Sequence, residues 1–244
     1  MIHYFNHNMV IFLSFRLQQP ILPSREEHLG TLWKITQLLQ PFGLPIEHWY
    51  PPAPTQKKSL AQAAFDENGP TPEALEILRV QDEKDGMTSY RRTGVWSGKE
   101  KGRRCSFSIS FSSDPDLPTC LLYLQFQEVA ALDQANNMQR FMRGLLEIWP
   151  RAACIEVGPL MYYTTHRVFP KRPGAGWMLY LPRAIAPEEL PDAAALEPVM
   201  EGGTQKGTII ASVSDGIFSI DDPEHLRIAN AIEMRLAGLD LLPR

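Results

Sequence analysis

The sequence predicts an α+β fold in which helices pack on a mainly antiparallel sheet. Two patterns support this fold class. The spacing of apolar residues switches between the helical period and the strand period, and the segments lack the regular strand–helix alternation of a parallel sheet. The chain has 244 residues, of which 44% are hydrophobic, so its core is expected to need neither a disulfide nor a metal. We expect one domain over residues 9–243, with a division into lobes at 9–150 and 151–243 left open.

The first strand is expected at the apolar run from Met9 to Phe15. This run is too short to cross a membrane, and it has neither the basic segment nor the cleavage site of a signal peptide. We therefore expect a cytoplasmic protein without a membrane segment. Residues 1–8 are interpreted as a disordered extension, or as the product of a start codon placed too far upstream.

Three helices are expected before residue 85. The residues from Ser24 to Glu27 match a capping box and start a helix that Pro41 and Gly43 end. Two shorter helices follow near 58–66 and 72–82, and the second has Thr71 as its N-cap with Pro72 in the first turn.

The stretch 91–113 predicts a hairpin followed by a half-buried strand. Cys105, Phe107, Ile109 and Phe111 alternate with serines, so one face of this strand is apolar and the other polar. Residues 119–127 are apolar on both faces, which indicates a central strand, and 132–149 form an amphipathic helix that Pro150 ends.

The second half is predicted to mix strands and helices without a flexible linker. The expected segments are strands near 153–157, 160–168 and 176–182, an acidic helix over 186–200, a hairpin over 208–220 with Asp215-Gly216 as its turn, and a last helix from Asp222-Pro223 to Gly238.

We find no catalytic, cofactor-binding or metal-binding motif. Gly94 to Glu100 imitates a phosphate-binding loop, but only three residues separate the glycines and Glu100 would repel phosphate. The six histidines have no local metal-ligand spacing, and the three cysteines are interpreted as buried thiols. The sequence thus favours a protein that is not an enzyme. A site assembled from scattered residues around Cys105 and His166 is the alternative.

Six basic residues of the hairpin could follow a nucleic-acid backbone. They are Arg91, Arg92, Lys99, Lys101, Arg103 and Arg104. The charges of an edge hairpin also prevent edge-to-edge aggregation, and this explanation is favoured because the chain has a net charge of −4. A nucleic-acid adaptor that uses the hairpin 91–104 is kept as a further alternative.

Two kinds of residue are candidates for binding a protein partner. Acidic residues gather in two segments and could meet a basic partner, although a solvated helix face and helix capping also explain them. Aromatic residues could anchor a partner, whereas Trp96 is expected to fix the hairpin to the core. The candidate partner-binding residues are Trp49, Tyr50, Trp96, Glu188, Glu189, Asp192, Asp221 and Asp222.

Four segments together resemble the immunity protein 52 family of bacterial polymorphic-toxin systems. They are SREEHLGTLWKITQLL, AQAAFDENGPTPEAL, TGVWSG and the ending GTIIASVSDGIFSIDDPEHLRIANAIEMRLAGLDLLP. The similarity covers roughly residues 9–243, and its most specific part is the ending. Trp96 or Trp177 corresponds to the tryptophan of that family, with Trp96 favoured.

The resemblance implies a function in binding rather than in catalysis. Proteins of this family are encoded beside toxins, usually nucleases with a restriction-endonuclease fold, some delivered by type VI secretion. The implied partner is a cognate toxin, encoded by an adjacent gene and neutralised in the producing cell. No contact residues follow from the resemblance, and no cofactor is expected.

Overall fold

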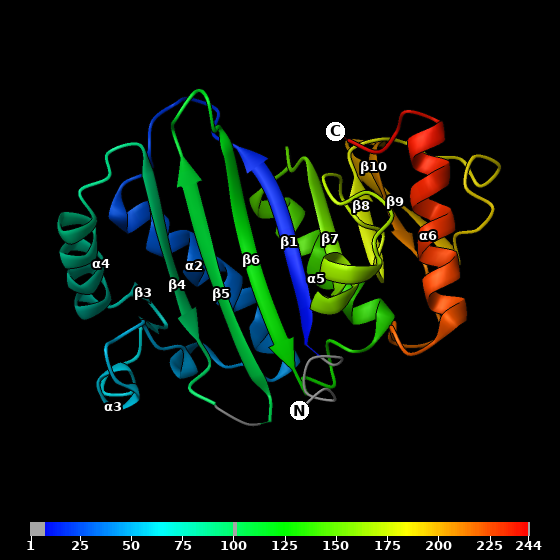
Figure 1. Cartoon of the computed structure of the whole chain (residues 1–244). Coiled ribbons are helices and arrows are strands. Elements are labelled where there is room, and N and C mark those ends of the chain that lie inside the picture. Colours follow the sequence, from blue (N-terminus) through cyan, green and yellow to red (C-terminus); the bar gives the residue numbers. More distant parts are fainter. Residues whose placement is uncertain (1–7, 100–101, 244) are drawn as a thin grey trace. The chain divides into compact units, whose positions relative to one another are not determined.

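The computed structural model describes residues 8–99 and 102–243. Most of the predicted N-terminal extension and Lys101 of the hairpin lie outside these residues. Within them, eight strands form one sheet in the order β4-β5-β6-β1-β7-β8-β10-β9, and β2 pairs with β3 separately (Figure 1). The strand pairs β4–β5, β5–β6, β7–β8, β8–β10 and β9–β10 are all antiparallel. The fold is α+β with an antiparallel sheet, as predicted.

The chain divides into two compact units that interleave along the sequence. One unit contains Ser14–Ala131 and Gly144–Pro150. The other contains the residues up to Leu13, Leu132–Arg143 and the segment from Arg151 onward. Two of the four boundaries between the units fall inside elements, one in β1 (Met9–Arg16) and one in α5 (Ala135–Ile148).

The unit that contains Ser14–Ala131 is built on β4 (Tyr90–Trp96), β5 (Arg104–Ser112) and β6 (Thr119–Gln127). One face of these strands is apolar, and His28 of α2 (Arg25–Leu39) packs edge-on against Phe111 there, with ring centroids 4.6 Å apart. Figure 1 shows α2 behind the three strands, whereas no helix in the described part of this unit covers their near face.

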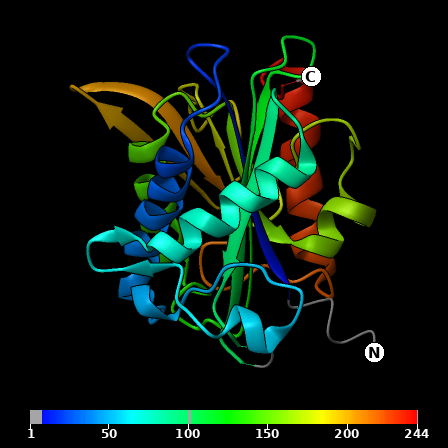
Figure 2. The ribbon, with the colours of Figure 1, turned by 90° about the vertical axis from the view of Figure 1, so that its left-hand side faces the viewer.

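Local signals in the sequence set the helix starts of this unit. Ser24 and Glu27 form the predicted capping box, which satisfies two backbone N–H groups at the start of α2. Thr71 caps α4 (Pro72–Asp85), whose first residue is a proline. Figure 2 looks onto the sheet edge at β4 and shows α4 in front of this edge, with α2 to one side of the strands.

The helix expected at 58–66 is wrong. Only a short α3 (Gln56–Ser59) forms, and the chain then makes a tight hairpin of β2 (Phe65–Asp66) and β3 (Gly69–Pro70). Asp66 Oδ1 accepts the backbone N–H of Asn68 at 2.7 Å, and Gly69 has a φ of +141° that favours glycine. This turn chemistry outweighs the helical pattern of the preceding alanines.

The other unit contains β7 (Cys154–Pro159), β8 (Met178–Leu181), β9 (Ala195–Glu201), β10 (Thr204–Ala211) and α6 (Pro223–Gly238). The predicted strand at 160–168 is instead a helical turn over Tyr162–His166. Two polar residues of this segment, Thr164 and Thr165, accordingly hydrogen-bond back to the carbonyl of Met161.

The predicted acidic helix at 186–200 is also wrong: the segment is a loop followed by β9. Pro191 and Pro198 cannot continue a helix, whereas a proline is tolerated in a strand at the edge of a sheet. The hairpin expected at 208–220 with Asp215-Gly216 as its turn is wrong: the only strand among these described residues is the end of β10, which pairs with β9 through a turn at Gly202-Gly203. Both glycines have positive φ, 56° and 79°, as such a turn requires.

Candidate partner-binding surface

The uncovered face of β4–β6 is a continuous polar surface with aromatic side chains, here called the serine face. Strand register places its residues in cross-strand rows. The rows are Arg92–Ser110–Leu121, Gly94–Ser108–Tyr123 and Trp96–Ser106–Gln125. Tyr and Trp offer large contact areas at low entropic cost and serine offers adaptable hydrogen bonding, which is the composition of antibody binding sites.

A glycine hollows the centre of this face. A Cβ at Gly94 would lie 2.4 Å from the carbonyl oxygen of Phe107 and 2.7 Å from Cβ of Ser108, so the close approach of β5 requires glycine. The missing side chain opens a groove of about 290 Å³ between Arg92, Trp96 and Tyr123. A side chain of a partner could enter this groove.

Hydrogen bonds hold the polar side chains of the serine face in place. The Tyr123 hydroxyl donates to Gln125 Oε1 at 3.1 Å, and Gln125 Nε2 donates to Ser106 Oγ at 3.0 Å. The Arg92 guanidinium donates to Ser108 Oγ at 3.3 Å. Burial raises the pKa of Tyr123, so its hydroxyl stays protonated and can donate. The surface is therefore ordered before any partner binds, which lowers the entropic cost of binding.

Trp96 fixes the loop 49–52 to the edge of β4. Its indole Nε1 donates to Ser59 Oγ at 2.7 Å, and the backbone of Tyr50 pairs with that of Trp96 in an antiparallel bridge. Trp96 and Tyr50 are both half-buried. Trp49 is a candidate for partner binding in the sequence, but its side chain is fully buried and its ring lies 4.9 Å from the Phe107 ring. Only Tyr50 and Trp96 of the three predicted aromatics can reach a partner from this surface.

A second groove, of about 420 Å³, runs along the outer edge of β4. It shares Pro52, Arg92, Gly94 and Ser108 with the groove on the serine face, so the two are continuous. Its rim carries Met87 and Tyr90, whose side chains are 54% and 36% exposed. Exposed apolar side chains at the rim of a groove are typical of a protein-binding site.

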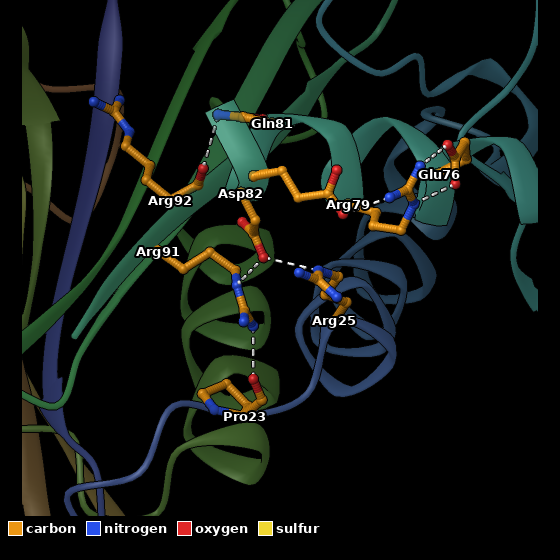
Figure 3. Close-up of polar contacts among 9 residues, drawn as sticks. Pro23, Arg25, Glu76, Arg79, Gln81, Asp82, Arg91 and Arg92 are labelled. Carbon is orange, nitrogen blue, oxygen red and sulfur yellow. Dashed lines mark hydrogen bonds and ion pairs between the residues drawn. The ribbon is translucent and has the colours of Figure 1, made fainter. Parts of the chain in front are cut away.

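An ion-pair cluster builds the wall of this edge groove. Figure 3 shows Asp82 of α4 between Arg25 of α2 and Arg91 of β4. Its Oδ2 lies 2.9 Å from Nε of each arginine. Gln81 Nε2 also donates to the carbonyl oxygen of Arg92 at 3.3 Å, which ties α4 to the strand edge. The cluster thus fixes the position of α4 relative to β4.

The acidic candidates lie in the other unit. Glu188 and Asp192 are exposed in the loop before β9, whereas Glu189 uses its Oε2 to accept the backbone N–H of Ala186 at 2.8 Å. Arginines of α6 approach this loop: Arg227 interacts electrostatically with Asp192, and Arg235 Nε donates to the Glu189 carbonyl at 3.0 Å. The predicted acidic patch is therefore mixed in charge.

Asp221 and Asp222 lie at the start of α6. Asp222 Oδ1 accepts the backbone N–H of Glu224 at 2.8 Å, as predicted for an N-cap. Its other oxygen lies 3.6 Å from His225 Nε2. Asp222 is therefore occupied by capping, and Asp221 is the exposed member of the pair.

The predicted thiols are buried, as expected, and none of the three forms a disulfide within the described residues. Burial raises the pKa of Cys105, so this thiol is protonated and a poor nucleophile. In the described residues, 8–99 and 102–243, no group of three or more His, Cys, Asp or Glu is placed to hold a metal ion.

The sequence prediction misses Tyr123 and Gln125, because it assigns apolar residues to both faces of the strand 119–127. The buried positions Cys120, Leu122 and Leu124 in fact alternate with half-exposed ones. This alternation continues to Phe126 and indicates that the other face of β6, which carries Tyr123 and Gln125, is only partly buried.

None of the helices that the structure describes has both the length and the apolar character needed to cross a lipid bilayer. Comparison with protein-family models gives no match, and comparison with curated proteins gives none either. The family resemblance in the sequence therefore stays a prediction.

Proposed function

We propose that this chain is an immunity protein that binds a cognate antibacterial toxin of the nuclease class and neutralises it by direct contact. The observation that carries the proposal is the ordered serine face with its adjoining edge groove. The sequence resemblance supplies the class of partner. In this proposal the protein acts in the cytoplasm of the cell that makes the toxin.

The chemistry of the surface suits a protein partner. A stable interface needs roughly 1,200–2,000 Å² of buried area and a few well-packed anchors. The groove at Gly94 can take one anchor, while Tyr123, Trp96 and Tyr90 offer apolar contact around it. Arg92 is exposed in both grooves and could meet a carboxylate of the toxin, including one that binds a metal in a nuclease active site.

Co-expression with the product of the adjacent gene tests the proposal. We expect that product to be toxic alone and harmless with this protein. The double variant Arg92→Glu/Tyr123→Ala should lose protection while its circular dichroism spectrum stays that of the native protein. Met234→Ala is the matched control, because Met234 is 55% exposed on α6, outside the serine face.

Two results would contradict the proposal. Either the neighbouring gene product is not toxic, or its toxicity is unchanged when this protein is present. Full protection by the folded double variant would mean that this chain neutralises the toxin through a surface other than the serine face.

A further inference from the structure

A small pocket of about 280 Å³ lies where the β4–β5 turn meets the loop after α2, separate from the serine face. Its lining residues are Gly43, Leu44, Pro45, His48, Trp49, Ser97, Lys99 and Arg103. This volume is below the usual size of a site for a drug-sized ligand, so the pocket suits a small ion or a single functional group.

The pocket is lined by basic side chains. His48, Lys99 and Arg103 contribute to it, and none of the lining residues that the structure describes is acidic. Within residues 8–99 and 102–243, no carboxylate forms an ion pair with Lys99 or Arg103. Gathered cations without counter-charges favour an anion at the pocket.

Two residues that line the pocket have an unusual backbone conformation. Gly43 lies beside the guanidinium of Arg103 and has a left-handed φ of 84°. Arg103 itself has a φ of 44°, which is uncommon for a residue with a side chain. Strained residues of this kind are concentrated at ligand-binding sites.

Trp49 provides a second, independent observation. Its indole Nε1 is buried and has no hydrogen-bond partner in the described part of the chain. A buried donor without an acceptor is unfavourable, and native proteins satisfy nearly all such groups. Ser97, by contrast, is already engaged, because its Oγ accepts the Cys105 N–H at 3.0 Å.

We infer that this pocket binds a small oxyanion, a carboxylate or a phosphate group, with Lys99 and Arg103 as its cationic contacts and the Trp49 indole as a neutral donor. The inference does not depend on the proposed toxin. It rests on the pocket, its unpaired cations and the unsatisfied indole.

Nuclear magnetic resonance of the full chain tests it, with sodium phosphate and sodium acetate as separate probes at constant ionic strength. The Trp49 indole N–H signal, assigned by its loss in Trp49→Phe, should shift saturably. Arg103→Ala should weaken the apparent affinity about tenfold, the loss expected for one charge-assisted hydrogen bond. Arg104→Ala is the matched control, since Arg104 Nη2 donates to Gln127 Oε1 at 3.1 Å and does not line the pocket.

The two probes distinguish the source of the anion. Saturation by phosphate alone assigns a phosphate group, saturation by acetate alone assigns a carboxylate, and saturation by both assigns a general oxyanion site. No saturable shift with either probe overturns the inference. An equal loss of anion affinity in Arg103→Ala and Arg104→Ala also overturns it, because the loss would then reflect the removal of one positive charge and not of a contact in the pocket. If Arg103→Ala fails to fold, Arg103→Lys should keep the charge and still weaken binding.

Discussion

Two acids, the half-buried Glu156 and the fully buried Glu233, hold the loop between β7 and β8 in the unit that contains α6. Glu233 accepts hydrogen bonds from the Tyr162 hydroxyl and from two backbone N–H groups, that of Val168 at 2.8 Å among them. Glu156 Oε1 accepts the backbone N–H of Gly174 at 2.7 Å. Buried carboxyl groups need such partners in place of water. The loop conformation therefore depends on acids supplied by β7 and α6.

The protonation of Glu156 should make the stability of this unit depend on pH. Burial raises the pKa of Glu156 from 4.5 to about 7; the Gly174 N–H and Arg167 oppose this shift, and Glu233 adds to it. The carboxyl group thus ionises more readily in the unfolded chain. Its contribution to the free energy of unfolding is fully present below pH 4.5 and is lost as the pH rises through 7.

Glu156→Gln should remove this dependence while keeping the acceptor for Gly174. At about pH 8 the variant should be more stable than the native protein by up to about 3 kcal/mol, and at about pH 4 the two should agree. Urea unfolding at both pH values measures the difference. Glu188→Gln, at an exposed position of the same unit, serves as the control. Parallel pH profiles for the native protein and Glu156→Gln would show that Glu156 ionises freely in the folded state.

At the level of elements, Asp82 joins α2, α4 and β4 through one carboxylate. The side chains of Asp82 and Arg91 are only 15% and 14% exposed, so solvent screens their interaction weakly. The pair of Glu76 and Arg79 on α4 is also an ion pair, but its side chains are 59% and 44% exposed. The acid of each pair lies on α4, and the two pairs differ in burial, which makes them a matched test.

Asp82→Ala should lower the free energy of unfolding by about 2 kcal/mol, because it leaves two partly buried guanidinium groups without their counter-charge. Glu76→Ala should leave the urea midpoint unchanged, because exposed ion pairs contribute little. Urea denaturation of both variants in the same buffer measures the contrast. Equal midpoints for Asp82→Ala and Glu76→Ala would mean that the bridge at Asp82 contributes no more than a surface pair.

The same elements show which parts of the fold the sequence could predict. The caps at Ser24, Thr71 and Asp222 were correct because a cap depends on residues within one helical turn. The β9–β10 hairpin was missed because Pro198 fits a strand only at a sheet edge, and edge position depends on the whole topology. Trp49 was misjudged for a similar reason, since Phe107 on a distant strand buries it.

At the scale of the whole molecule, the candidate site was only partly predictable. Trp96 and Tyr50 were chosen from the sequence, but the serine face also needs Tyr123 and Gln125 from β6, which strand register brings beside β5. The acids were chosen by charge alone, and Arg227 and Arg235 of α6 offset them. Local patterns identify single anchors, whereas a surface requires the pairing of strands far apart in sequence.

The kinetics of toxin binding can distinguish the serine face from the acidic loop before β9 as the contact surface. The serine face is proposed as the contact surface, so Tyr123→Ala should raise the dissociation rate of the toxin complex about tenfold, as for an interface hot spot. Charge reversal at Glu188 and Asp192, which spares the capping role of Glu189, should act on the association rate and only at low salt. Surface plasmon resonance at low and physiological salt measures both rates, with Met234→Ala as the control. Unchanged dissociation for Tyr123→Ala, together with fast dissociation for the reversed acids, would place the interface on the unit that contains α6.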